Sequence, residues 1–111
     1  MHLLKENLGD NISIDIASDG QVALEILSAS AFDLMITDLV MPNIEGLELI
    51  PKIKKQCPAL PIIAVSGSNP YYLVMAKKLG IQDAFTKPIN AHKFISSVKD
   101  ILKAQPQMQN A

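Results

Sequence analysis

The sequence predicts an α/β fold, a doubly wound parallel sheet with helices on both faces, from three patterns. Segments with the pattern of strands alternate with segments that carry apolar residues at helical spacing, which is typical of a parallel sheet. The runs 34–36 and 62–65 are continuously apolar, as in strands that are covered on both faces. Residues 12–16 alternate between isoleucine and polar side chains, which indicates a strand near an edge.

Length and composition bound the possible functions. At 111 residues the chain has room for one domain, expected over 1–104 with a polar tail at 105–111. Nearly half of the residues are apolar and the net charge is −1, which argues against disorder and against a nucleic-acid-binding surface. The sequence has no apolar segment suited to a signal peptide or a membrane span, and its only cysteine is Cys57. We therefore expect a cytoplasmic domain without a membrane segment, a disulfide or a zinc site.

The expected elements follow the local patterns along the chain. Residues 2–8 have the pattern of the end of a helix, with Gly9 as its C-terminal stop. Pro51 lies inside a helical pattern and predicts a kink or a late start, because proline removes a backbone hydrogen bond. The other expected elements are strands at 12–16, 33–37, 62–65 and 83–86, and helices from Ser18 or Asp19 to about 28, at 44–56, from Pro70 to Gly80 and from Asn90 to 102.

Polar side chains stand where three of the expected strands end: Asp38, Ser66 and Lys87. Because the carboxyl ends of parallel strands meet at one edge of a sheet, we expect these side chains to converge. There an aspartate can attack phosphorus, a lysine can bind a phosphoryl oxygen and a serine hydroxyl can donate to another. Each residue alone also has an ordinary explanation, as a cap of a turn or helix or as a solvated lysine. The three together favour a phosphoryl-transfer site.

These residues and their neighbours resemble the receiver domain of two-component response regulators. The matching motifs, over residues 3 to about 103, are Thr37-Asp38-Leu39-Val40-Met41-Pro42 followed by Gly46, Ser66-Gly67, and Lys87-Pro88-Ile89. The resemblance implies a flavodoxin-like sheet of order 2-1-3-4-5, with Asp38 as the phospho-acceptor, Ser66 as the hydroxyl that follows phosphorylation, and Lys87 before a cis Pro88. It also implies Mg²⁺ on the Asp38 carboxylate and the Val40 carbonyl. The implied phosphoryl donor is a sensor histidine kinase or a histidine phosphotransfer protein.

Two departures from the family pattern change these expectations. The family's first, central strand ends in two magnesium-binding acids and has no counterpart here, and Asp19 and Glu45 are not obvious replacements. Without that strand, two sheet edges are expected to close up, to be exchanged between chains or to stay unpaired, so that a homodimer through the exposed edge is an option. In the last strand Ala84 takes the place of the family's rotating aromatic residue, and Phe85 is expected to pack inward.

The leading function is a receiver domain that is phosphorylated at Asp38 and signals through its C-terminal helices, with no enzymatic activity beyond its own phosphorylation and dephosphorylation. The alternative, favoured by the missing acids and by Ala84, is a non-phosphorylated pseudo-receiver that docks or dimerises. A haloacid-dehalogenase-like phosphatase would need a second aspartate where Val40 stands. A flavodoxin would need a phosphate-binding loop before its first helix, which the sequence lacks.

Overall fold

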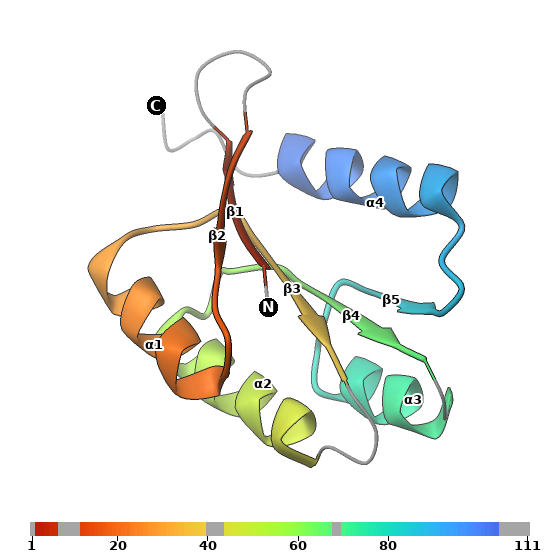
Figure 1. Ribbon diagram of the computed structural model, residues 1–111, viewed down its shortest axis with the longest axis horizontal. Coiled ribbons are helices and arrows are strands. Elements are labelled where there is room, and N and C mark those ends of the chain that lie inside the picture. The colour runs from red at the N-terminus through yellow and green to blue at the C-terminus, as the bar shows by residue number, and fades with distance from the viewer. Residues whose placement is uncertain (1, 7–11, 40–43, 68–69, 105–111) are drawn as a thin grey trace.

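The computed structural model describes residues 2–6, 12–39, 44–67 and 70–104. Three helices cover one face of a central sheet, and the last helix lies alone on the other face (Figure 1). In chain order the elements are β1 (His2–Glu6), β2 (Ile12–Ile16), α1 (Gly20–Ala29), β3 (Leu34–Asp38), α2 (Ile44–Gln56), β4 (Ile62–Ser66), α3 (Pro70–Lys78), β5 (Asp83–Thr86) and α4 (Ala91–Lys103).

The sheet has the order β2-β1-β3-β4-β5 and is mixed. The pairs β3–β4 and β4–β5 are parallel, whereas β1 is antiparallel to both of its neighbours. The prediction of a helix end over 2–8 is therefore wrong for His2–Glu6, which is a strand, and the sheet is not purely parallel. Without a central strand, two sheet edges were expected to lack a neighbour, but His2–Glu6 lies between β2 and β3 and pairs with both. The α/β receiver-type architecture is confirmed.

Tertiary packing explains why β1 is a strand. Side chains alternate across a strand, so Leu3 joins the core beneath α1, α2 and α3 while Leu4 joins the core beneath α4. The strand also supplies backbone partners to β2 and β3, whose polar groups would otherwise lack them. The short connection between β1 and β2 permits only antiparallel pairing, because a parallel crossover needs a dozen or more residues.

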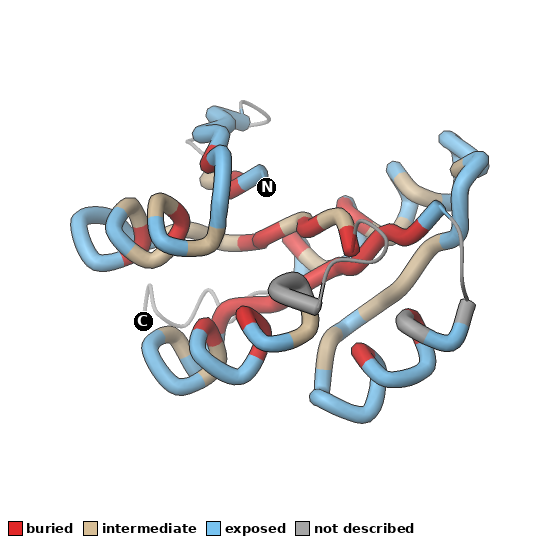
Figure 2. Tube along the Cα trace, turned by 60° about the horizontal axis from the view of Figure 1, so that its bottom comes forward, coloured by how far each residue is buried: buried red, intermediate tan, exposed pale blue. Residues whose placement is uncertain are grey.

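Two apolar cores lie on the two faces of the sheet, and β3 and β4 supply residues to both. Figure 2 shows the resulting band of buried backbone through the middle of the molecule. Met35 and Ile62 face the three-helix side, whereas Leu34 and Ile63 face α4. All four are fully buried, as expected of strands with continuous apolar runs.

The remaining elements agree closely with their predicted ranges, and their ends have local causes. Of the two residues from which α1 was expected to run, Ser18 and Asp19, it is Asp19 that caps the helix, since its carboxylate accepts a hydrogen bond from the Val22 N–H at 2.9 Å. The Asn90 side chain caps α4 in the same way, at 3.0 Å from the Lys93 nitrogen. Helix α2 begins at Ile44, ahead of Pro51, so the late start is wrong. Gly9 and the tail 105–111 lie outside the described residues.

No helix in the described ranges is both long enough and apolar enough to cross a lipid bilayer.

Candidate functional site

Asp38 and Lys87 meet at the carboxyl edge of the parallel strands. Asp38 is the last residue of β3 and lies beside Val65 of β4, which in turn lies beside Phe85 of β5. Lys87 follows the end of β5, and its ammonium Nζ lies 2.6 Å from the Asp38 Oδ2. The predicted convergence of these two side chains is thus observed. Their ion pair links the end of β3 to the end of β5, across the intervening strand β4.

Ser66 lies at the same edge but is placed differently. It ends β4 beside Thr86, and its carbonyl accepts a hydrogen bond from the Lys87 N–H at 2.9 Å. Val65 is the register partner of Asp38, and Ser66 is the next residue of β4. Since side chains alternate along a strand, the Ser66 side chain points to the opposite face of the sheet from that of Val65. Its hydroxyl is buried and has no hydrogen-bond partner among the described residues. Ser66 therefore touches the site through its backbone.

The connection to Lys87 has two special backbone features. The Lys87–Pro88 peptide bond is cis, as the receiver resemblance implied. Gly67 leaves room for the lysine stem, since a Cβ at that position would lie 3.2 Å from the Lys87 Cδ. In the sequence, the glycine that follows Ser66 indicates this packing, although the spacing of Gly67 and Lys87 along the chain does not show which of their atoms are in contact.

Solvent reaches the ion pair. The side chains of Lys87 and Asp38 are 47% and 39% exposed, so water screens their attraction and the pair can open at little cost. The Asp38 Oδ1 is buried and has no hydrogen-bond partner among the described residues, which leaves Oδ2 as the accessible carboxylate oxygen. A reactant can therefore approach the oxygen that already lies next to a cation.

Of the two ligands expected for magnesium, the described residues include only Asp38. Mg²⁺ requires close to octahedral oxygen coordination, usually with one or two carboxylates. The unpartnered Asp38 Oδ1 is one suitable ligand, but no group of three or more carboxylate, histidine or cysteine side chains gathers in the described part of the chain. Val40, whose carbonyl was the second expected ligand, and the Glu45 side chain lie outside the described residues.

The aromatic residue of the last strand points away from this edge. Phe85 packs with the core beneath α4, and its ring meets that of Phe94 edge to face at 5.3 Å between centroids. Ala84 packs on the opposite side, against the three-helix core. The inward orientation predicted for Phe85 is confirmed.

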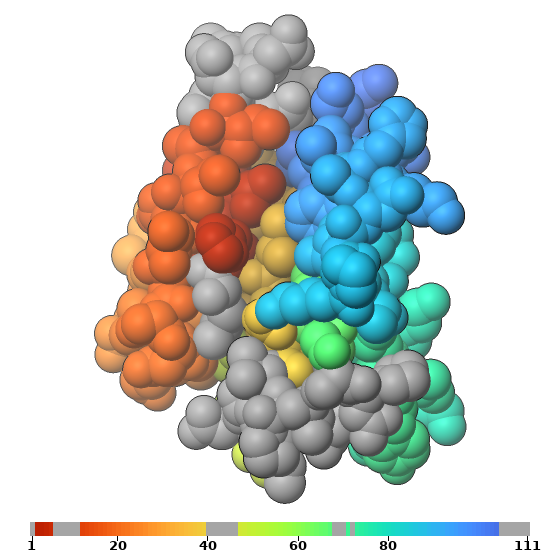
Figure 3. Space-filling view, turned by 45° about the vertical axis from the view of Figure 1, so that its right-hand side comes forward, coloured from red at the N-terminus to blue at the C-terminus, as the bar shows by residue number. Residues whose placement is uncertain are grey.

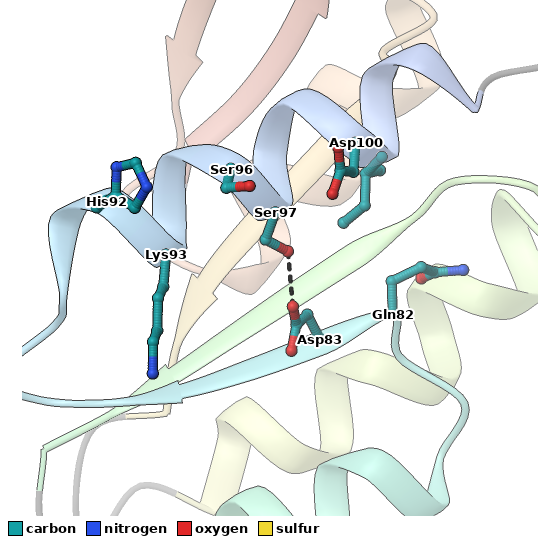
Figure 4. A pocket seen from close by; sticks show the side chains of 8 residues that line it. Gln82, Asp83, His92, Lys93, Ser96, Ser97 and Asp100 are labelled. Atoms are coloured by element: carbon teal, nitrogen blue, oxygen red, sulfur yellow. Dashed lines mark hydrogen bonds between the residues drawn. The ribbon is translucent and has the colours of Figure 1, made fainter.

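A separate pocket of about 450 Å³ lies between α4 and the start of β5 (Figure 4). Seven of the eight residues that line it are polar or charged, and the Ser97 hydroxyl donates a hydrogen bond to the Asp83 carboxylate at 2.6 Å. Lys87 follows the opposite end of β5. This pocket is therefore distinct from the Asp38 site.

Comparison with known proteins gives a consistent result. The model of the response regulator receiver domain family matches residues 1–99. Response regulator ArlR of Staphylococcus haemolyticus is 33% identical over 98 residues, which are 88% of this chain and 45% of the relative. ArlR of Staphylococcus aureus is 34% identical over the same shares of the two chains. The chain thus spans less than half the length of these curated relatives.

Known structures agree with the sequence comparison. The crystal structure of the receiver domain of NtrX from Brucella abortus matches with a TM-score of 0.71 and 30% identity, covering 80% of this chain and 77% of that one. A response regulator from Thermotoga maritima matches with a TM-score of 0.69 and 25% identity, covering 79% and 74% of the two chains. The family match covers most of the sequence, and the same sheet carries the aspartate–lysine pair at its carboxyl edge. This chain belongs to the response regulator receiver domain family of two-component signalling.

Proposed function

We propose that this receiver domain accepts a phosphoryl group on Asp38 from a phosphohistidine of a sensor kinase or of a histidine phosphotransfer protein. The observation that supports the proposal is the 2.6 Å contact between Lys87 Nζ and Asp38 Oδ2 at the carboxyl edge of the sheet. A carboxylate that is accessible and lies next to a cation is suited to attack an anionic phosphoryl donor.

In the proposed step the Asp38 Oδ2 attacks the phosphorus of the donor. A new oxygen–phosphorus bond forms as the donor's nitrogen–phosphorus bond breaks, and the leaving imidazole takes up a proton. The product on the chain is an acyl phosphate. The Lys87 ammonium then lies beside a phosphoryl oxygen, because the pair is weak enough to exchange one anionic oxygen for another.

Signalling would pass from this edge to the last helix through the backbone. Lys87 is joined to the start of α4 by the short segment that contains the cis Pro88 and the capping Asn90. A shift of Lys87 towards a phosphoryl group would pull on the Ser66 carbonyl, which its N–H contacts, and on the start of α4. Because Phe85 is held against Phe94 in the core, the proposed route does not use an aromatic rotation.

No step in this proposal uses Mg²⁺, because the Val40 carbonyl, the second ligand expected for it, lies outside the described residues. Magnesium remains a family-based expectation for this chain. Its contribution can be measured by running the phosphorylation experiment with and without the ion.

The experiment is incubation of the chain with acetyl phosphate or phosphoramidate, followed by intact-mass and peptide mass spectrometry. We expect one phosphoryl group on Asp38, lost on treatment with hydroxylamine because acyl phosphates react with it. Asp38→Asn should abolish the modification, and Lys87→Ala should slow it. Asp100→Asn is the matched control, since Asp100 is an exposed carboxylate on α4, away from the site. An unmodified chain under all conditions, or equal labelling of Asp38→Asn, would refute the proposal.

The second candidate is a docking module that works without phosphorylation. It is favoured by the lack, among the described residues, of any cluster of three or more metal-binding side chains, and by the Ser66 hydroxyl, which has no hydrogen bond to Asp38. Under this function, Asp38→Asn would leave the affinity for a phosphotransfer partner unchanged in a calorimetric titration. A lower affinity of the variant would count against it.

A further inference from the structure

Strand β2 is an exposed sheet edge. Among the described strands it pairs with β1 alone, and all five of its residues are exposed to solvent. It contains no proline, and Asp15 is its only charged residue. The outer edge of such a strand presents unpaired N–H and C=O groups, and few of the usual features that prevent edge-to-edge pairing are present. The other edge strand, β5, is shorter and half-buried.

One face of β2 carries an exposed apolar stripe. Ile12, Ile14 and Ile16 are 44%, 54% and 68% exposed. They lie beside Glu6, Leu4 and His2 of β1, on the face that α4 covers further along the sheet. Figure 3 shows β2 in orange on one side of this face and α4 in blue on the other. Leu4 is buried in the core beneath α4, whereas the three isoleucines lie outside that core and are exposed to solvent.

We propose that two copies of this chain associate through antiparallel pairing of their β2 strands about a two-fold axis at Ile14. In this register all five residues are paired. Ile14 meets Ile14 of the second copy, and each Ile12 meets an Ile16. Cross-strand pairs of β-branched residues stabilise a sheet, and the two sheets become one. A two-fold contact of this kind is closed, so association stops at two copies.

Charge selects this register. On the opposite face of the strand, Asp15 of each copy lies beside Ser13 of the other, whose hydroxyl donates to the Lys5 carbonyl of its own sheet at 3.4 Å, so that no like charges face each other in this register. If the axis moved from Ile14 to Asp15, the two aspartates would face each other directly, which is destabilising. If the axis moved to Ser13, fewer residues of the two β2 strands would be paired with each other. The sequence of β2 is thus most complementary to itself when the axis passes through Ile14.

The proposed contact is small. A five-residue strand from each copy buries much less than the roughly 800 Å² per partner of stable complexes. We therefore expect a weak dimer that forms with increasing concentration. The contact does not involve Asp38, so it can be tested independently of phosphorylation.

The test is sedimentation equilibrium of the full chain from micromolar to near-millimolar concentration. We expect a monomer–dimer equilibrium. Ile14→Lys places two like charges at the axis and should make the chain monomeric. Ile95→Lys is the matched control, because Ile95 is an exposed isoleucine on α4 rather than on the strand edge, and this variant should dimerise as before. Both substitutions are at exposed positions, and circular dichroism will confirm that the variants fold.

A second pair of variants tests the register. Ser13→Asp places a carboxylate opposite Asp15 at two symmetric positions and should raise the dimer dissociation constant about tenfold. Ser13→Lys places a cation there and should not weaken the dimer. Asp38→Asn should dimerise like the unmodified chain. A chain that is monomeric throughout, that forms larger aggregates, or whose dimer is unaffected by Ile14→Lys would overturn the proposal, as would equal effects of the two Ser13 variants.

Discussion

At the residue scale, the site combines an exposed ion pair with a buried hydroxyl. The Asp38–Lys87 pair is short, yet both side chains remain well exposed to solvent. The Ser66 hydroxyl is buried and has no partner among the described residues. Replacing either side chain is therefore expected to cost the domain little stability, for a different reason at each position.

Replacement of Lys87 should have little effect on stability. Because solvent screens the pair, we expect Lys87→Ala to change the free energy of unfolding by no more than about 1 kcal/mol. Urea denaturation followed by circular dichroism measures this change. A loss several times larger would mean that Lys87 supports the fold rather than the chemistry of Asp38.

Replacement of Ser66 should leave the domain as stable or make it more stable. A buried hydroxyl without a partner carries an uncompensated cost of desolvation, so Ser66→Ala is expected to change the free energy of unfolding by between zero and about 1 kcal/mol in the stabilising direction. Ser97→Ala is the matched control and should cost about 1 kcal/mol, because its hydroxyl donates to Asp83 at 2.6 Å. A destabilising effect of Ser66→Ala equal to that of Ser97→Ala would show that the Ser66 hydroxyl has a partner in solution.

At the element scale, β1 is the segment whose structure depends most on its surroundings. Its residues have the local pattern of a helix end, but its two leucines reach the two cores only when the segment is extended. The strand also joins β2 to the rest of the sheet, since β2 pairs with no other strand in the described part of the chain. The exposed edge of β2 is therefore positioned by β1.

Truncation of Leu3 tests the position of β1. Leu3 is fully buried, so Leu3→Ala should cost about 2–5 kcal/mol of unfolding free energy. Leu79→Ala is the matched control, because Leu79 directly follows α3 and is exposed, so its truncation should cost much less. Chemical denaturation of the two variants gives the comparison. Equal costs would show that β1 does not lie in the core.

At the scale of the whole molecule, the two cores share one sheet. Leu34 and Met35 are neighbours in β3 and point into different cores, so neither core can be lost without disturbing the strand that both share. Small domains built in this way usually unfold in a single transition. The helices on the two faces should therefore lose their structure together.

Thermal unfolding of the Val98→Ala variant tests this coupling. Val98 lies in the core beneath α4, whereas both tyrosines belong to α3 on the other face. We expect the melting temperature to fall by several degrees, and by the same amount in tyrosine fluorescence and in far-ultraviolet circular dichroism. A shift in one signal only would mean that the two faces unfold separately.

Most of the fold could be read from local patterns because those patterns and the tertiary contacts agree. The apolar runs of β3 and β4 predict strands covered on both faces, and both are buried between helices. The convergence of Asp38 and Lys87 also followed from the sequence, because parallel strands bring their carboxyl ends to one edge. The position of the Ser66 hydroxyl did not, since it depends on the strand register.

The sequence by itself determined the α/β class, the receiver resemblance and the strand-end residues, because periodicity and spacing are local properties of the chain. Only the tertiary structure decided the state of His2–Glu6. Its helical pattern is overridden because an extended segment buries Leu3 and Leu4 on opposite faces and pairs with two strands at once. The same strand places β2 at the outer edge, where its isoleucines are exposed.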